Sequence, residues 1–126
     1  GLIFDKSSGG FLCTSRSAVI RVSRERAATV LAGHQIVRGD VDGTGSEARF
    51  SNVASGALTA DGATLFLCSD HKIKRMEVAT GAVTTLAGSG ERGRADGVGL
   101  AAQFSYPAGL APSFDGSKLF VADMLK

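Results

Sequence analysis

A tandem repeat with a period of about 54 residues constrains the fold of this chain more than any other feature. Two stretches, 29–50 and 84–104, carry the same succession of Thr-x-Leu-Ala-Gly, Asp-Gly-x-Gly and Ala-x-Phe. The matched pairs are Asp42 with Asp96, Phe50 with Phe104, Asp61 with Asp115, and Gly33 with Gly88. The first three pairs are 54 positions apart and the last is 55 apart. Such a period predicts stacked supersecondary units, each burying its apolar face on a neighbour.

Within each unit, short apolar segments alternate with turn residues, as is typical of β-strands. Asp61-Gly62 supplies a hairpin turn in which Gly tolerates positive φ, and residues 65–68 are apolar throughout, as in a strand covered on both faces. The expected strands of the central unit lie near 54–59, 64–69, 72–78 and 83–87. Four antiparallel strands per unit, repeated radially, form a β-propeller blade. The capped helical periodicity that a solenoid of strand-plus-helix units would need does not occur.

The repeat predicts an all-β propeller segment of about two and a half four-stranded blades. Blade 1 is expected at about 1–50, blade 2 at about 51–104, and the start of blade 3 at about 105–126. A ring needs at least about four blades, and exposed strand edges invite association. We therefore expect the remaining blades of a longer protein, or self-association of several copies, to close the ring. The longer protein is favoured because both ends fall inside blades.

Charge and composition narrow the classes of partner. The chain has 14 basic and 12 acidic residues, a formal net charge of +2, and 44% hydrophobic residues. This balance fits a globular domain and gives little long-range attraction to nucleic acid or anionic lipid. Apolar runs are far shorter than a membrane span, so no membrane contact is evident. Nothing in the sequence indicates a compartment.

Several motifs together resemble the long form of the NHL repeat. They are residues 70–75 (Asp-His-Lys-Ile-Lys-Arg), 83–88, 95–104, 107–111 and 115–123. Asp70 stands where that repeat usually has Asn, and residues 1–30 match less well. The resemblance implies a six-bladed propeller and a role in scaffolding or protein binding. It also implies RNA binding in some members and metal-dependent lyase chemistry of peptide amidation in a few.

Two motifs that suggest ligands are better explained as loops. Gly88–Gly93 fits G-x-G-x-x-G, but turn residues follow it where a dinucleotide site needs a helix. Aligning Asp40-Val41-Asp42-Gly43 with a calcium loop places Arg38 and Arg49 where carboxylates are required. A turn in which the Asp42 side chain bonds nearby amides is the simpler prediction. We therefore expect no cofactor and no metal site.

Catalytic candidates are absent from the sequence patterns. Cys13 and Cys68 are expected at equivalent blade positions as free, buried thiols. His34 and His71 do not recur at one repeat position and show no ligand spacing, so His71 is expected to be structural. No serine or cysteine nucleophile motif is visible. Enzymatic activity therefore has no positive support, and no catalytic residue is predicted.

The candidate partner-binding residues are Lys72, Lys74 and Arg75, on a strand where Lys72 and Lys74 share a face. A solvated outer strand is favoured over an RNA site, because base stacking needs aromatic side chains and the chain has one Tyr and no Trp. The predicted function is a non-enzymatic protein-interaction scaffold. The alternatives are an RNA-binding propeller with a basic face, or part of a metal-dependent propeller enzyme whose ligands lie outside this segment.

The repeat also predicts which side chains are buried. Leu12, Leu67 and Val121 are predicted to be buried at equivalent positions of successive blades. Phe50 and Phe104 are predicted to be equivalent and to fill the seams where one blade meets the next.

Overall fold

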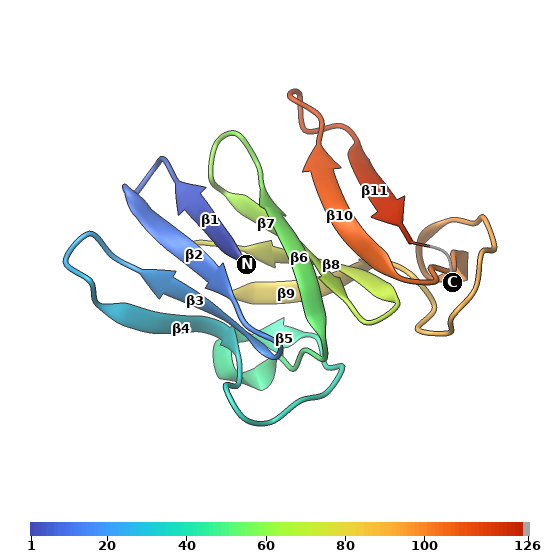
Figure 1. Cartoon of the computed structure of the whole chain (residues 1–126), viewed down its shortest axis with the longest axis horizontal. Coiled ribbons are helices and arrows are strands. Elements are labelled where there is room, and N and C mark those ends of the chain that lie inside the picture. The colour runs from blue at the N-terminus through green and yellow to red at the C-terminus, as the bar shows by residue number, and fades with distance from the viewer. Residues whose placement is uncertain (125–126) are drawn as a thin grey trace.

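The computed structural model describes residues 1–124. In this part of the chain all eleven strands lie in three antiparallel sheets (Figure 1). The first sheet has the order β1-β2-β3-β4. Its strands are β1 (Leu2–Asp5), β2 (Gly10–Thr14), β3 (Ala18–Val22) and β4 (Ala28–Gly33). This simple meander is the topology of a propeller blade.

The second sheet has the order β5-β9-β8-β7-β6, and the third contains β10 and β11. Their strands are β5 (Gly43–Thr44), β6 (Val53–Leu58), β7 (Thr64–Ser69), β8 (Lys72–Glu77), β9 (Ala82–Ala87), β10 (Pro107–Pro112) and β11 (Leu119–Asp123). Two short 3-10 helices, Gly45–Glu47 and Gly99–Ala101, lie in the connections between sheets. The chain is thus a β-propeller segment, as predicted.

The strands of the central unit begin and end within one residue of their predicted bounds. The prediction of a solvated outer strand is wrong for β8, which has β7 on one side and β9 on the other. The outermost position belongs to β5, a two-residue strand in the connection from the first sheet that pairs with β9. The connection therefore fastens the outer edge of one blade before the chain starts that blade's first strand.

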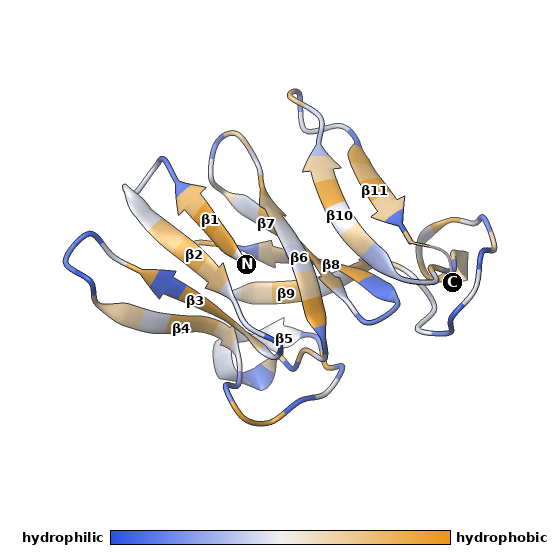
Figure 2. Cartoon of the chain, viewed as in Figure 1, coloured by the Kyte–Doolittle hydropathy of each residue, from blue (hydrophilic) through white to orange (hydrophobic). Residues whose placement is uncertain are grey.

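The first strands of the three sheets lie side by side, with β6 between β1 and β10 (Figure 1). Apolar residues run along the strands and polar residues gather at the turns (Figure 2). The core forms where the first two sheets face each other. Its fully buried members include Leu12, Val19, Phe50, Leu65 and Leu67.

The strand pairing of the first two sheets matches at a shift of 54 residues through their second and third strands. Ser15 N donates to Ala18 O around one two-residue turn. Ser69 pairs with Lys72 around the corresponding turn. Gly33 and Gly88 are 55 residues apart because the second unit has one extra residue between its third and fourth strands.

This register corrects two predictions, the equivalence of Leu12 with Leu67 and that of Cys13 with Cys68. The equivalent pairs are Leu12 with Phe66, Cys13 with Leu67, and Thr14 with Cys68. Leu12 and Leu67 are both fully buried, but they are not equivalent. Since alternate residues of a strand point to opposite faces, the one-residue difference places them on the two facing surfaces of neighbouring blades. Val121 does correspond to Leu67 and is half-buried.

The contact between the first two blades is close along their first strands. A β-carbon at Gly56 would lie 3.2 Å from Ile3 Cδ1 and 3.1 Å from Leu67 Cδ2. Ile3 is opposite Leu12 in the first sheet, and Gly56 is opposite Leu67 in the second. The absence of a side chain at Gly56 therefore lets the two sheets approach each other here.

The two seam phenylalanines are equivalent, as predicted. A β-carbon at Gly33 would lie 2.8 Å from Phe50 Cδ2, and one at Gly88 would lie 3.3 Å from Phe104 Cδ2. Phe50 is fully buried, whereas Phe104 is half-buried. The first seam is dry because Phe50 is fully buried, whereas the second seam is partly exposed at Phe104.

Candidate functional site

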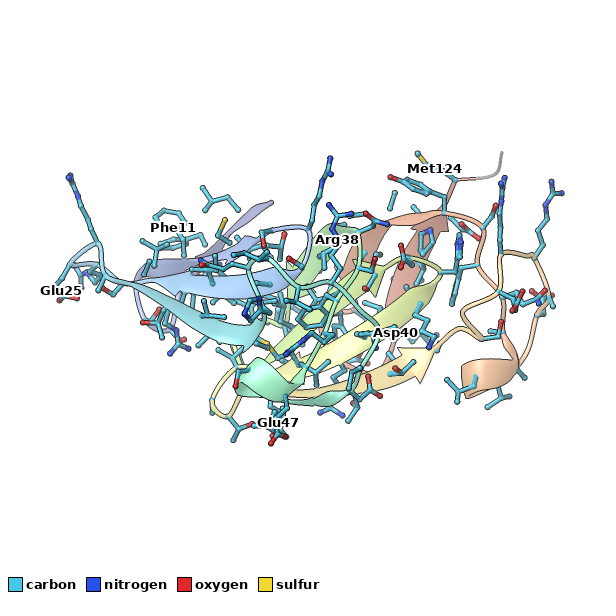
Figure 3. The ribbon with its side chains drawn as sticks, turned by 90° about the horizontal axis from the view of Figure 1, so that it is seen from below. Phe11, Glu25, Arg38, Asp40, Glu47 and Met124 are labelled. Atoms are coloured by element: carbon cyan, nitrogen blue, oxygen red, sulfur yellow. The ribbon has the colours of Figure 1, made fainter. Side chains whose placement is uncertain are left out.

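The predicted basic residues do not form one exposed patch. The side chain of Lys74 is 1% exposed, and its ammonium lies 2.7 Å from an oxygen of Asp40 and 2.8 Å from Asp42 Oδ1. Lys72 also pairs with Asp40, which is labelled in Figure 3. The side chain of Lys74 is therefore buried and paired with two carboxylates, and its role in partner binding stays a prediction.

Asp42 reaches this lysine from the connection that leads to β5. It also accepts hydrogen bonds from the backbone N–H and the hydroxyl of Thr85, both at 2.9 Å. Burial alone would raise the pKa of Asp42, but the bonds from Lys74 and Thr85 outweigh it and hold the pKa below its usual value. The prediction that Asp42 bonds nearby amides is therefore wrong, because its partners are 32 and 43 positions away.

Arg75 differs from the two lysines. It is exposed and points to the opposite face of β8, where it lines a hollow with Phe66, Leu86 and Leu119. No ion pair involves Arg75 among the residues that the structure describes. Of the three predicted partner-binding residues, Arg75 is the most exposed, whereas Lys72 and Lys74 are paired with carboxylates.

A cleft of about 490 Å³ opens where the first strands of blades 2 and 3 begin. All three sheets contribute to it through turns or strand starts. Its lining comprises Arg16 of the β2–β3 turn, residues 52–54 at the start of β6, Asp70 and His71 of the β7–β8 turn, and Tyr106 and Pro107 at the start of β10. Concave sites at the loop ends of a rigid scaffold are common binding positions.

Equivalent side-chain bonds hold the strand starts at this cleft. In blade 2, the Ser69 hydroxyl donates to Ser51 O at 2.9 Å and accepts from Ser51 N at 3.2 Å. In blade 3, the Asp123 carboxylate accepts from the backbone N–H groups of Ser105 and Tyr106. Each blade therefore fixes the residue just before its first strand to the end of its second strand.

Asn52 and Tyr106 directly follow the two bonded serines and are equivalent at the 54-residue shift. Asn52 Nδ2 donates to Asp70 Oδ1 at 2.8 Å. Both residues have left-handed backbones, with φ of 50° for Asn52 and 49° for Asp70. Asn and Asp tolerate this region better than other side chains, which explains why Asp can replace the Asn that the NHL-like pattern has at position 70.

Two side chains of the cleft can contact a ligand directly, and a third polar group lies buried behind them. Tyr106 is 47% exposed beside Pro107. Arg16 is exposed and has no ion pair among residues 1–124. Nδ1 of His71 is buried and has no hydrogen-bond partner in the described structure. The cleft thus combines an aromatic wall, a cation and an unsatisfied ring nitrogen.

The glycine-rich and calcium-loop-like motifs of the sequence have structural roles. Gly88–Gly93 is part of an irregular loop, as predicted, and leads to turn residues and not to an α-helix. The carboxylates of Asp40 and Asp42 are occupied by the two lysines. Within the described residues, no group of three His, Cys, Asp or Glu side chains could hold a metal ion. No helix of residues 1–124 is long and apolar enough to cross a membrane.

Both cysteines are free, as predicted. Cys68 is fully buried, and burial together with the charge of Asp123 raises the pKa of its thiol to about 12. Cys13 is half-buried and lies on the opposite face of its blade from the face that Cys68 takes in the next blade. A thiol with such a high pKa is protonated at neutral pH, so Cys68 acts as a small apolar side chain.

The cleft could not be found from the sequence, because its residues come from turns and strand starts separated by up to 91 positions. A signal was present for Arg16 and Asp70, which are equivalent turn residues once the 54-residue shift is applied to the first unit. The sequence also indicated the burial of Lys74, because Lys74 shares a strand face with Met76, which is fully buried.

Comparison with known proteins supports the fold. No family model matches the chain. The chain is similar to an auxiliary nutrient binding protein from Bacteroides thetaiotaomicron, with a TM-score of 0.82, 22% identity, and coverage of 97% of this chain and 34% of that one. A second auxiliary nutrient binding protein, from Bacteroides ovatus, gives a TM-score of 0.79 at 22% identity, with the same coverage of 97% and 34%. These likenesses show the propeller architecture.

A sequence relative matches part of the chain more closely. Protein SUPPRESSOR OF QUENCHING 1, chloroplastic, of Arabidopsis thaliana is 44% identical over 87 residues, which are 68% of this chain and 8% of that protein. The chain therefore spans a small part of this relative's length and about a third of each of the two bacterial structures.

Proposed function

We propose that this chain is an NHL-type propeller segment that acts as a non-enzymatic protein-interaction scaffold. The observation that carries the proposal is the cleft at the strand starts, to which three sheets contribute and which exposes Tyr106 and Arg16. Aromatic residues and Arg are enriched where proteins bind each other. The side-chain bonds of Asp123 hold Tyr106, and those of Ser69 hold the segment before β6, so the cleft has a rigid frame that lowers the entropy lost on binding.

The charges favour a protein partner over RNA. The basic strand that suggested RNA carries two lysines already paired with Asp40 and Asp42. Phosphate binding would have to break those pairs. Tyr106 is the one aromatic residue that lines the cleft, whereas nonspecific RNA sites stack successive bases on several aromatic rings.

A photo-crosslinking experiment tests the proposal. Benzoylphenylalanine placed at Tyr106 in the full-length protein should form discrete protein adducts in the cells that produce it. The matched control is the same probe at Phe114, which is 95% exposed on the β10–β11 turn at the other end of the strands. We expect adducts at position 106 that protease removes and ribonuclease leaves intact.

Two results would contradict the scaffold proposal. Equal adducts at both positions would mean that the cleft has no special role. Ribonuclease-sensitive adducts, together with RNA affinity that falls steeply with salt, would indicate the RNA-binding alternative, because phosphate contacts release counterions.

A further inference from the structure

The cleft contains one charged group without a partner. Asp123 accepts two backbone hydrogen bonds at the start of β10, and Asp70 accepts the amide of Asn52. Arg16 carries a guanidinium with five donors and has no ion pair among the described residues. The carboxylates around the cleft are thus engaged while its arginine is open to a ligand.

Arginine favours planar, bidentate acceptors, and the commonest in proteins is a carboxylate. In the same cleft, the half-exposed ring of Tyr106 offers an apolar surface of the kind that packs against proline, aromatic or aliphatic side chains. The volume of about 490 Å³ is large enough for a few residues of an extended chain.

From these features we propose that the cleft binds a peptide segment of a partner protein in which an acidic side chain meets Arg16 and a neighbouring apolar residue packs on Tyr106. This inference rests on the proposed scaffold function and names the ligand class of the same site. Asp70 lines the same cleft and carries a charge that repels an acidic segment, which tunes the affinity downward.

The inference is tested by selecting a displayed library of random twelve-residue peptides against the full-length protein. Selected sequences should be rich in Asp or Glu next to proline or an aromatic residue. For a synthetic copy of the leading peptide, Arg16→Glu should weaken binding by about tenfold or more, because like charges then face each other. Tyr106→Ala should also weaken it, and Asp70→Asn should strengthen it.

Arg24→Glu is the matched control, since Arg24 is an exposed arginine on the β3–β4 turn, away from the cleft. It should leave the affinity unchanged. Arg16→Gln, which removes the charge without reversing it, should give an intermediate loss. Unchanged cooperative melting in each variant keeps binding effects separate from folding effects.

The inference is overturned if selected peptides are basic or neutral, if no peptide is enriched, or if Arg16→Glu and Arg24→Glu act alike. These results leave the scaffold proposal standing when the crosslinks at position 106 still form. Loss of those crosslinks would remove the scaffold proposal itself, so the two failures are distinguishable.

Discussion

Replacing both acids around Lys74, by Asp40→Asn with Asp42→Asn, should lower the free energy of unfolding by about 3 kcal/mol. The variant leaves the ammonium of a side chain that is 1% exposed without a counter-charge. Removing one side of a buried ion pair typically costs ~3–5 kcal/mol, and the lower end is expected because amide oxygens still accept hydrogen bonds. Denaturant unfolding at pH 7 measures the change.

The reverse substitution should be mild. Lys74→Met fills the same buried space with an apolar side chain and leaves carboxylates that are 43% exposed and stay hydrated. Stability should change by no more than about 1 kcal/mol, since apolar replacement of a buried charge is often neutral. Equal losses in the two variants would contradict the burial of Lys74.

The same network predicts acid sensitivity. Burial would raise the pKa values of Asp40 and Asp42, but hydrogen bonds from the lysines outweigh it, so both pKa values are lower in the folded protein. A lowered folded pKa stabilises the protein above the unfolded value of about 4, and this stabilisation is lost as the pH falls through the folded values. The Asp40→Asn, Asp42→Asn variant should therefore lose less stability than the native chain between pH 5 and 2.

Phe50→Ala is expected to cost about 3–5 kcal/mol, the range for removing a fully buried aromatic ring. Its ring lies against the backbone at Gly33, where φ is 85°, so the backbone cannot easily move into the space left behind. Phe104→Ala, at the equivalent position, should cost clearly less because Phe104 is half-buried. Equal costs would contradict the difference between the two seams.

Most of the fold could be predicted from the repeat. The 54-residue period placed the strands of the central unit within one residue, because turn residues such as Asp61-Gly62 mark their ends and alternation marks their faces. The equivalence of Phe50 and Phe104 followed from spacing alone. Strand β5 could not be predicted, because a strand of two residues carries no periodicity.

The register of the first unit was mispredicted for a physical reason. Phe-Leu-Cys occurs at 11–13 and again at 66–68, and matching those letters gives a shift of 55. The hydrogen-bonded turn that starts after Thr14 sets the shift at 54 instead. Backbone pairing decides which face a side chain takes, and a slip of one residue inverts every face.

The candidate site was harder to predict because it is assembled from separate turns. The sequence drew attention to the basic run of β8, whose lysine partners lie in the preceding connection, 32 positions away. No local sequence pattern shows that Asp42 bonds Thr85 of β9. The cleft residues Arg16 and Tyr106 likewise meet only because three first strands lie side by side.

The most direct test of the blade packing is a double-mutant cycle between Ile3 and Gly56. A β-carbon at Gly56 would lie 3.2 Å from Ile3 Cδ1, so Gly56→Ala crowds that atom, and Ile3→Val removes it. The account predicts that Gly56→Ala is more favourable in the Ile3→Val background, with a coupling of about 0.5–1 kcal/mol in unfolding free energy. Additive effects would contradict it, because Ile3 would then not face the neighbouring blade.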